Sequence, residues 1–276
     1  MYVINNLYSR FEEKEKISAV KLEDKKEIQL PGKIDLPGAL RVVNDILNIN
    51  ETSLLKEKVI SLTNKQRVEN GNIEVLKESE MLDLSAEKIL QDMFDRQYFE
   101  HISPSGVGVA DLGEEVGYEY ILIGENLAMG NFKDEQNLID AWMASSGHRA
   151  NILNSRYTEI GVAVGSGNFE GHDIWMAVQH FGTPRSICPP IDQVFLGVIN
   201  LNQYKIKEME IDLLARRKAI DENNGAIYEG STYSEQIEKY NELIIPYNNK
   251  ISELKKQIDE YNNQVRAFNL CLTEHQ

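Results

Sequence analysis

Residues 141–165, AWMASSGHRANILNSRYTEIGVAVG, change from helical to strand-like periodicity around a histidine that follows a glycine. The residues just before this histidine predict a helix that begins at Asp134 or Glu135 and is closed by Gly147. Downstream, EIGVAVGSG (159–167) and DIWMAVQHFG (173–182) are β-rich runs separated by NFEGH, which is typical of a hairpin. This mixture of helices with an antiparallel strand pair predicts an α+β fold.

Two further helices are expected upstream of this stretch. Residues 52–71 have apolar residues at helical spacing, and residues 84–101 repeat the pattern with Ser85 as the expected N-cap. Residues 39–48 predict one short helix, within a charged and proline-broken segment, 1–52, that we interpret as an arm or linker. The residues expected to face inward from the two longer helices are Leu55, Val59, Leu62, Val68, Ile89, Met93 and Phe94.

Composition narrows the classes of partner. The chain has 276 residues, of which 42% are hydrophobic, enough for a sizeable core, and a net charge of -15. Such an acidic chain is repelled by nucleic-acid phosphates and by anionic membranes, so no nucleic-acid partner is expected. No stretch approaches the length of a transmembrane helix, and the first residues lack the pattern of a signal peptide.

Residues 187–276 predict an antiparallel helical hairpin. In the second half, ten apolar residues from Ile237 to Phe268 follow alternating steps of three and four, which is a coiled-coil pattern interrupted by Pro246, where we expect a kink or break. The first half has a weaker pattern from Phe195 to Ile220, and DENNGAIYEGS (221–231) is the expected turn. In an antiparallel pair the numbers of facing residues add to a constant, which is 460 for Ile220–Tyr240, Leu213–Tyr247, Ile206–Leu254 and Ile199–Tyr261.

The two cysteines fit this register. Cys188 and Cys271 add to 459, so they are expected side by side at the open end of the hairpin, although a shift by one heptad would part them. We predict a disulfide there, and with it an oxidising compartment; the alternative is two ordinary thiols in a cytosolic protein.

Three polar residues between residues 98 and 151 are candidates for one site. His101 lies where a helix should end (YFEHISPSG, 98–106), Glu125 lies in a glycine-flanked turn or short strand (IGENLAMG, 123–130), and His148 follows Gly147. Their spacing alone does not bring them together, and each also has a plain structural explanation, such as a favourable interaction with a helix dipole or a cap.

As a set, these motifs resemble the CAP superfamily of cysteine-rich secretory, antigen 5 and pathogenesis-related proteins, and within it the bacterial SCP-like extracellular domains. The resemblance rests on the four segments YFEHISPSG, IGENLAMG, AWMASSGHRANILNSRYTEIGVAVG and IWMAVQHFG in this order, and covers roughly residues 53–183. It implies a three-layer α-β-α sandwich with an open cleft. The expected organisation is therefore an arm over 1–52, a CAP domain over 53–186 and the hairpin over 187–276.

The resemblance also implies a cleft with two histidines and two acidic residues. His101, His148 and Glu125 match three of them, but the position of the second acid, three residues after Trp142, is occupied by Ser145. Asp140 is nearby, but should point elsewhere on its helix. Two imidazoles can hold a divalent ion such as Zn²⁺, with Glu125 positioning water or one ring, and with so few ligands the affinity should be weak.

The remaining polar and aromatic residues favour structural roles. Asn126, Ser145 and Asn151 are expected to support the cleft, Trp142 and Trp175 to lie in the core, and His172 to be solvated, whereas strand alternation leaves the direction of His180 open.

Three functions remain open. The first is an extracellular or cell-envelope CAP protein, not a robust enzyme, that binds a lipid, peptide or glycan in the cleft, with a protein partner for the hairpin. The second is a hydrolase that uses Glu125, His101 and His148. The third is a structural component of the envelope that acts through the hairpin.

Overall fold

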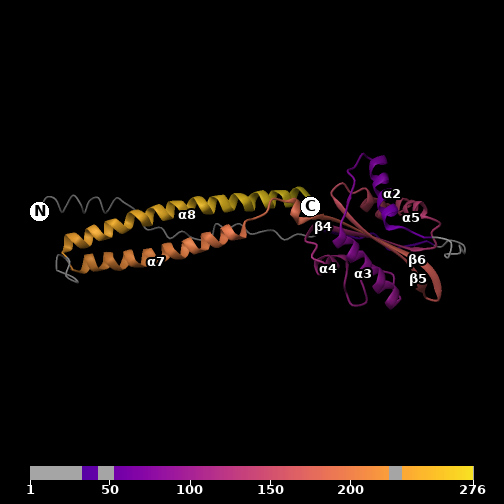
Figure 1. Cartoon of the computed structure of the whole chain (residues 1–276), viewed down its shortest axis with the longest axis horizontal. Coiled ribbons are helices and arrows are strands. Elements are labelled where there is room, and N and C mark those ends of the chain that lie inside the picture. The colour runs from indigo at the N-terminus through magenta and orange to yellow at the C-terminus, as the bar shows by residue number, and fades with distance from the viewer. Residues whose placement is uncertain (1–32, 43–52, 224–231, 276) are drawn as a thin grey trace. The chain divides into compact units, whose positions relative to one another are not determined.

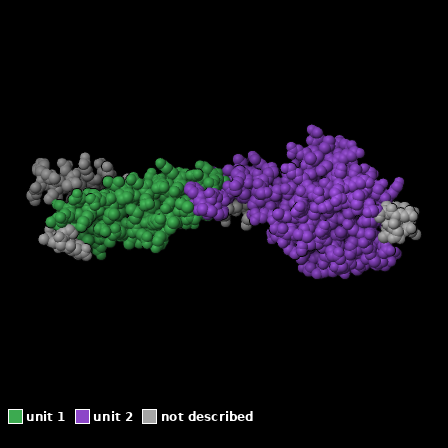
Figure 2. Space-filling model, viewed as in Figure 1, with its two compact units in different colours: residues 1–28, 196–265 green, residues 29–195, 266–276 purple. Residues whose placement is uncertain are grey.

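The computed structural model describes residues 33–42, 53–223 and 232–275. The described residues divide into two compact units, one within residues 196–265 and one within residues 33–195 together with 266–275 (Figure 2). The larger unit is a mixed sheet between two layers of helices, and the smaller contains most of two long helices (Figure 1). This is the α+β architecture expected from the sequence.

Six strands form the sheet in the order β1-β4-β6-β5-β3, with β2 also pairing with β4. The three long central strands pair antiparallel with one another: β4 (Tyr120–Gly130) with β6 (His172–Pro184), and β6 with β5 (Glu159–Phe169). β5 and β6 form the predicted hairpin, whose two loop residues, Glu170 and Gly171, both have positive φ as a tight primed turn requires. The short β3 (Lys77–Glu78) is parallel to β5.

Two short strands come from the segment that the sequence assigned to an arm. β1 (Lys33–Asp35) and β2 (Leu40–Val42) both pair in parallel with β4. The expectation of a helix over 39–48 is therefore wrong for residues 40–42, because pairing with β4 overrides their helical spacing; residues 43–48 lie outside the described part of the chain.

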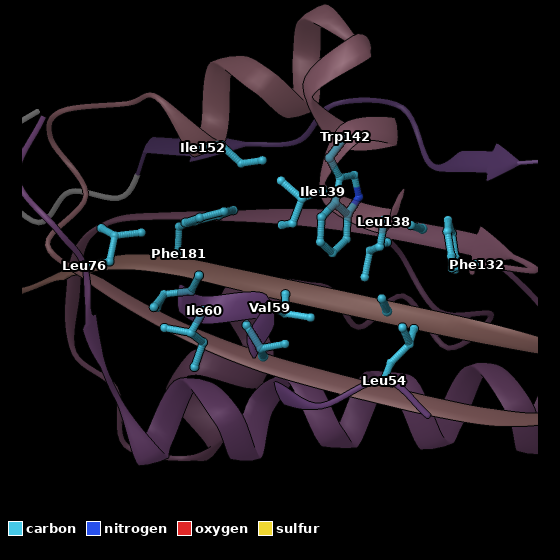
Figure 3. Packing of buried hydrophobic residues seen from close by; sticks show 14 of the residues in the cluster. Leu54, Val59, Ile60, Leu76, Phe132, Leu138, Ile139, Trp142, Ile152 and Phe181 are labelled. Carbon is cyan, nitrogen blue, oxygen red and sulfur yellow. The ribbon is translucent and has the colours of Figure 1, made fainter. Parts of the chain in front are cut away.

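One helical layer packs on each face of the sheet, so that successive strand residues belong to different cores. α2 (Lys56–Glu69), α5 (Glu135–Ala144) and α6 (Ser146–Ile152) cover one face, in a core centred on Trp142 (Figure 3). α3 (Glu80–Arg96) and α4 (Val109–Glu115) cover the other. Along β6, Ala177 belongs to the first core and Val178 to the second, as strand alternation requires.

The helix boundaries correct several expectations. α3 begins after Ser79, so Ser85 is not the N-cap but lies buried inside the helix, because the chain is already helical five residues earlier. The buried face of α2 is Val59, Ile60, Thr63 and Arg67, whereas Leu55 and Val68 are exposed. Asp134 caps α5: its Oδ1 accepts a hydrogen bond from the backbone N–H of Asn137 at 2.8 Å. Gly147 does not close that helix; it lies inside α6, which starts directly after Ser145.

α7 (Gln193–Asn223) and α8 (Tyr233–His275) are the two long helices. All residues of the four predicted pairs are buried except Ile220, which is half-buried. The side-chain amide of Asn202 donates to Gln257 Oε1 at 3.0 Å, and these two residue numbers add to 459, one short of the predicted constant. α8 continues through Pro246 without the expected break; proline removes one backbone hydrogen bond, and buried Tyr240 and Tyr247 anchor the helix on either side. The predicted turn lies largely outside the described residues.

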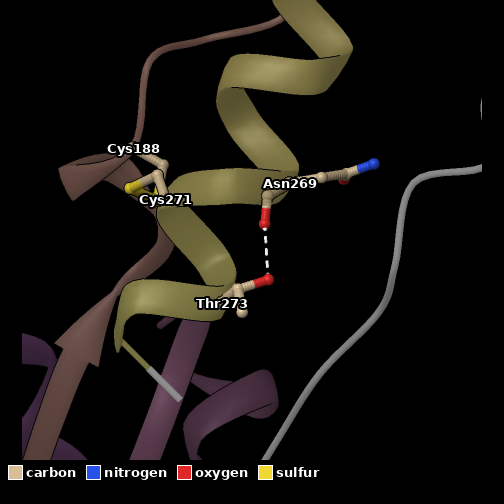
Figure 4. Close-up of a disulfide and its surroundings, with 4 residues drawn as sticks. All are labelled: Cys188, Asn269, Cys271 and Thr273. Carbon is tan, nitrogen blue, oxygen red and sulfur yellow. Dashed lines mark hydrogen bonds between the residues drawn. A yellow bond between two sulfur atoms is a disulfide. The ribbon is translucent and has the colours of Figure 1, made fainter.

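The predicted disulfide is confirmed. Cys188 and Cys271 are bonded, with their Cα atoms 5.7 Å apart (Figure 4). Around them Ile121, Phe268 and Leu272 form a small buried cluster, so the last turns of α8 are fixed to the beginning of β4.

Candidate functional site

The candidate site lies on β4 where its pairing with the N-terminal strands is interrupted. β1 ends opposite Gly124 and β2 begins opposite Ala128, so among the described residues no strand pairs with residues 125–127 on that side. Side chains take the place of a strand there: the Asn151 amide donates to the Glu125 carbonyl at 3.2 Å, and the Trp142 indole donates to the Leu127 carbonyl at 3.3 Å. The carbonyls of Glu125 and Leu127 are therefore satisfied by side chains.

Glu125 is at the centre of a buried polar network on the α3 face of the sheet. It lies opposite His180 in the β4–β6 register, and neither side chain is exposed. Glu125 Oε2 is 2.8 Å from His180 Nε2, and Oε1 is 2.6 Å from His101 Nδ1. Burial alone would raise the pKa of the Glu125 carboxyl, but the hydrogen bonds from the two imidazoles outweigh burial and hold this pKa below its usual value. Glu125 is thus a carboxylate with both oxygens occupied.

His180 is held from its other side by Ser85 of α3. Ser85 Oγ lies 2.5 Å from His180 Nδ1, and both residues are fully buried. Ser85, His180 and Glu125 are connected in the order of a serine hydrolase triad, but the serine cannot meet a substrate because it has no exposed surface. This chain of hydrogen bonds therefore orients Glu125 and is not nucleophilic machinery.

His148 approaches from α6, in the opposite helical layer. Its Nδ1 lies 2.8 Å from Ser145 Oγ, and its backbone carbonyl accepts a hydrogen bond from the Asn126 amide at 3.2 Å. Burial lowers the pKa of His148 to about 4, and the neighbouring His101 ring contributes in the same direction. His148 is therefore a neutral imidazole at pH 7.

A second polar network fixes α6 on its own face of the sheet. Asn126 donates to Gln179 Oε1 at 3.1 Å and accepts from Asn151 at 3.0 Å, while Gln179 donates to Thr63 at 2.7 Å. All four side chains are buried and come from β4, β6, α6 and α2. Asn126 and Asn151 thus connect the helix of His148 to the sheet.

Arg67 of α2 fixes the loop that follows α6. The guanidinium is fully buried and donates to the carbonyls of Ile152 and Asn154 at 2.8 Å and of Tyr157 at 3.2 Å, while its Nε donates to the Glu74 carbonyl at 2.8 Å. Burial lowers the pKa of this group to about 10, which leaves it charged at neutral pH. The direction of α6, and hence the position of His148, depends on this residue.

The two histidines share one property that suits them to bind a ligand. Both His101 Nε2 and His148 Nε2 are buried and have no hydrogen-bond partner among the described residues. Such a nitrogen costs about 1–3 kcal/mol unless water, an ion or a ligand satisfies it. Each of these nitrogens could donate a lone pair to a ligand, but the described residues contain no group of three or more His, Cys, Asp or Glu side chains arranged to hold a metal.

Ser85, His180, Gln179 and Thr63 were not predicted to belong to these networks: Ser85 was expected to cap a helix, and the direction of His180 was left open. A signal for two of them was present: the apolar runs of β4 (residues 121–128) and of β6 (residues 174–181) are each interrupted by an adjacent polar pair, Glu125–Asn126 and Gln179–His180. Aligning the two strands on these pairs would have placed Glu125 opposite His180. The roles of Ser85 and Thr63 follow only from helix packing.

The fold and this site are similar to those of the CAP superfamily. Residues 60–181 match the family model described as "CAP: Cysteine-rich secretory protein family", a family of extracellular proteins.

Among curated proteins, the chain is 40% identical over 126 residues to "Uncharacterized protein YkwD" of Bacillus subtilis (strain 168), an alignment that covers 46% of this chain and 47% of that protein. It is 34% identical over 112 residues to "Uncharacterized membrane protein YlbC" of the same organism, covering 40% of this chain and 31% of that one. The chain thus spans less than half the length of either relative.

Among solved structures, it is similar to an extracellular protein containing a SCP domain from Bacillus anthracis, with 28% identity, a TM-score of 0.40, and coverage of 46% of this chain and 39% of that chain.

Proposed function

We propose that this is a secreted or envelope-located CAP-domain binding protein, in which His101 and His148 form a weak site for a divalent cation such as Zn²⁺. The observation that carries the proposal is the pair of buried Nε2 atoms without a partner among the described residues. The disulfide supports an oxidising compartment, where such bonds persist. Among the described helices, none is long and apolar enough to cross a membrane.

The geometry favours binding over hydrolysis. A general base needs a free carboxylate oxygen within reach of water, and both oxygens of Glu125 are held by histidines. Ser145, which stands where the family has a second acid, is hydrogen-bonded to His148. We therefore assign the cleft the binding of an ion, or of an ion with a lipid, peptide or glycan ligand, and no reaction.

Isothermal titration with Zn²⁺ tests the ion site. The wild type should release heat with a single weak site, which should disappear in His101→Ala and in His148→Ala. His172→Ala is the matched control, because His172 is exposed and lies outside the site. Equal heats for the wild type and both site variants would exclude the cation site.

We also propose that the hairpin binds a second copy of itself, forming a four-helix bundle. Apolar side chains along α7 remain exposed: Val198, Leu201, Tyr204, Ile211 and Leu214. Such a row favours association, because covering it removes apolar surface from water. In analytical ultracentrifugation the wild type should dimerise and Leu201→Ser/Ile211→Ser should not, whereas Lys205→Ser should behave as the wild type. A monomeric wild type would contradict this proposal without affecting the ion site.

A further inference from the structure

Ser85 and His180 are buried polar residues that the ion site does not use directly. Neither has exposed surface, and they come from different layers, α3 and β6. They extend the network of Glu125 by two hydrogen bonds, of 2.5 Å between Ser85 Oγ and His180 Nδ1 and of 2.8 Å between His180 Nε2 and Glu125 Oε2. Ser85 Oγ also lies 3.0 Å from the carbonyl oxygen of Leu82 in its own helix. Because a hydroxyl has one proton, Ser85 donates it to His180 Nδ1 when the neutral His180 ring carries its proton on Nε2, facing Glu125.

Counting donors and acceptors determines the form of His101. An ionised carboxylate can only accept hydrogen bonds, so both nitrogens that contact Glu125 must carry a proton. His101 therefore carries its proton on Nδ1, and in the neutral ring Nε2 is left with a lone pair. Nε2 is the buried nitrogen without a partner among the described residues, so the lone pair is available to a ligand.

We propose that Ser85 and His180 are positioning residues that hold the Glu125 carboxylate in the orientation that keeps His101 in its Nδ1–H form, with Nε2 free for an electron-pair acceptor. The functional purpose of this role depends on the proposed cation site, but the tautomer of His101 can be observed without any ion. Glu125 could not hold the ring alone, because a carboxylate anchored at one oxygen can rotate, and His180 fixes the second oxygen.

The end point of the network distinguishes this role from core packing. The polar network on the other face, from Thr63 to Asn151, connects buried groups to one another and to the backbone. The Ser85–His180–Glu125 network instead ends at His101, a partly exposed ring with an unpartnered nitrogen among the described residues. Because this network ends at a lone pair on a partly exposed ring, we assign it to ligand binding.

The test is the tautomer of His101, read from ¹⁵N-labelled imidazole signals in two-dimensional NMR of the intact protein. With only five histidines in the chain, each signal can be assigned by single substitution. Wild type should show His101 as Nδ1–H. His180→Leu should give a mixture of tautomers, and His180→Gln, which can still donate to Glu125, should restore the wild-type form. Ser85→Ala should have a smaller effect in the same direction, and His172→Gln should have none.

Zn²⁺ titration of the same variants supplies the second measurement. The dissociation constant should rise about tenfold to a hundredfold in His180→Leu, the usual effect of losing a residue that orients a ligand, and recover in His180→Gln. Near-ultraviolet circular dichroism shows whether each variant is folded. If His180→Leu is not folded, the tautomer and the Zn²⁺ affinity of Ser85→Ala test the inference instead.

An Nε2–H form of His101 in the wild type, or an unchanged tautomer in folded His180→Leu, overturns the inference. If the wild type shows the Nδ1–H form but takes up no Zn²⁺, the cation site fails while the positioning role stands.

Discussion

Gly161 of β5 lies so close to Leu82 of α3 that a side chain at residue 161 would overlap the Leu82 backbone. Gly161 is also opposite His180 in the β5–β6 register, and three residues after Leu82 the same helix carries Ser85. The absence of a side chain at Gly161 thus allows α3 to approach the sheet closely enough for Ser85 to reach His180.

Gly161→Ala should therefore destabilise the domain by about 3 kcal/mol, because the obstruction is backbone and cannot rotate away. Chemical denaturation followed by tryptophan fluorescence gives the free energy of unfolding. The control is Gly38→Ala, where a new methyl group would meet no atom within 4 Å and little change is expected. A tolerated Gly161→Ala would show that α3 can move away from the sheet at small cost.

Arg67→Lys should lower the free energy of unfolding by more than about 3 kcal/mol, although it preserves the charge. A lysine cannot satisfy the four carbonyls that the guanidinium binds, and several buried acceptors would be left unpaired. The matched control is Arg149→Lys, an exposed arginine that donates to the Met143 carbonyl. Equal stabilities of the two variants would rule out a structural role for the Arg67 geometry.

Removing the disulfide with Cys188→Ala/Cys271→Ala should reduce stability by about 4 kcal/mol in the chain-entropy model, given the 83-residue separation of the cysteines. Hydrogen exchange should increase first in residues 266–275, because the bond fixes the end of α8 beside β4. The wild type in reductant should reproduce the variant. Unchanged protection of these residues in both samples would mean that Phe268 and Leu272 hold the helix end unaided.

Stability should depend on the protonation of His148. Its pKa is about 4 in the folded protein against 6.5 ordinarily, so between these values the unfolded chain binds the extra proton and folding weakens as the pH falls. The stabilisation is complete above about pH 6.5, and its loss by about pH 4 amounts to as much as about 3 kcal/mol. The low pKa of Glu125 acts in the same direction in acid.

His148→Gln isolates this contribution. Between pH 4 and pH 6.5, the slope of the unfolding free energy against pH should be shallower in His148→Gln than in the wild type. His172→Gln should have the same slope as the wild type. Parallel slopes for wild type and His148→Gln would indicate that the folded protein admits a proton to this ring.

Much of the architecture followed from periodicity. The alternation over 159–182 predicted the β5–β6 hairpin, and the three-four spacing of α8 predicted its buried residues. The Cys188–Cys271 bond could be predicted in the same way, because in two antiparallel helices joined by a turn the numbers of facing residues add to a constant. The short strands β1 and β2 escaped this reasoning, since three residues carry too little periodicity and their pairing with β4 is non-local.

The sequence by itself determined the α+β class and the helical hairpin pattern, and it put forward His101, Glu125 and His148 as candidates, because each depends on local spacing or on a motif. Only the tertiary structure decided that His180 and Ser85 complete the environment of Glu125, and that Arg67 and the asparagines fix the helix of His148. These contacts join residues 25 to 95 positions apart. Which residues become partners depends on which faces of the sheet and helices meet in the packed core, and this cannot be predicted from a local sequence pattern.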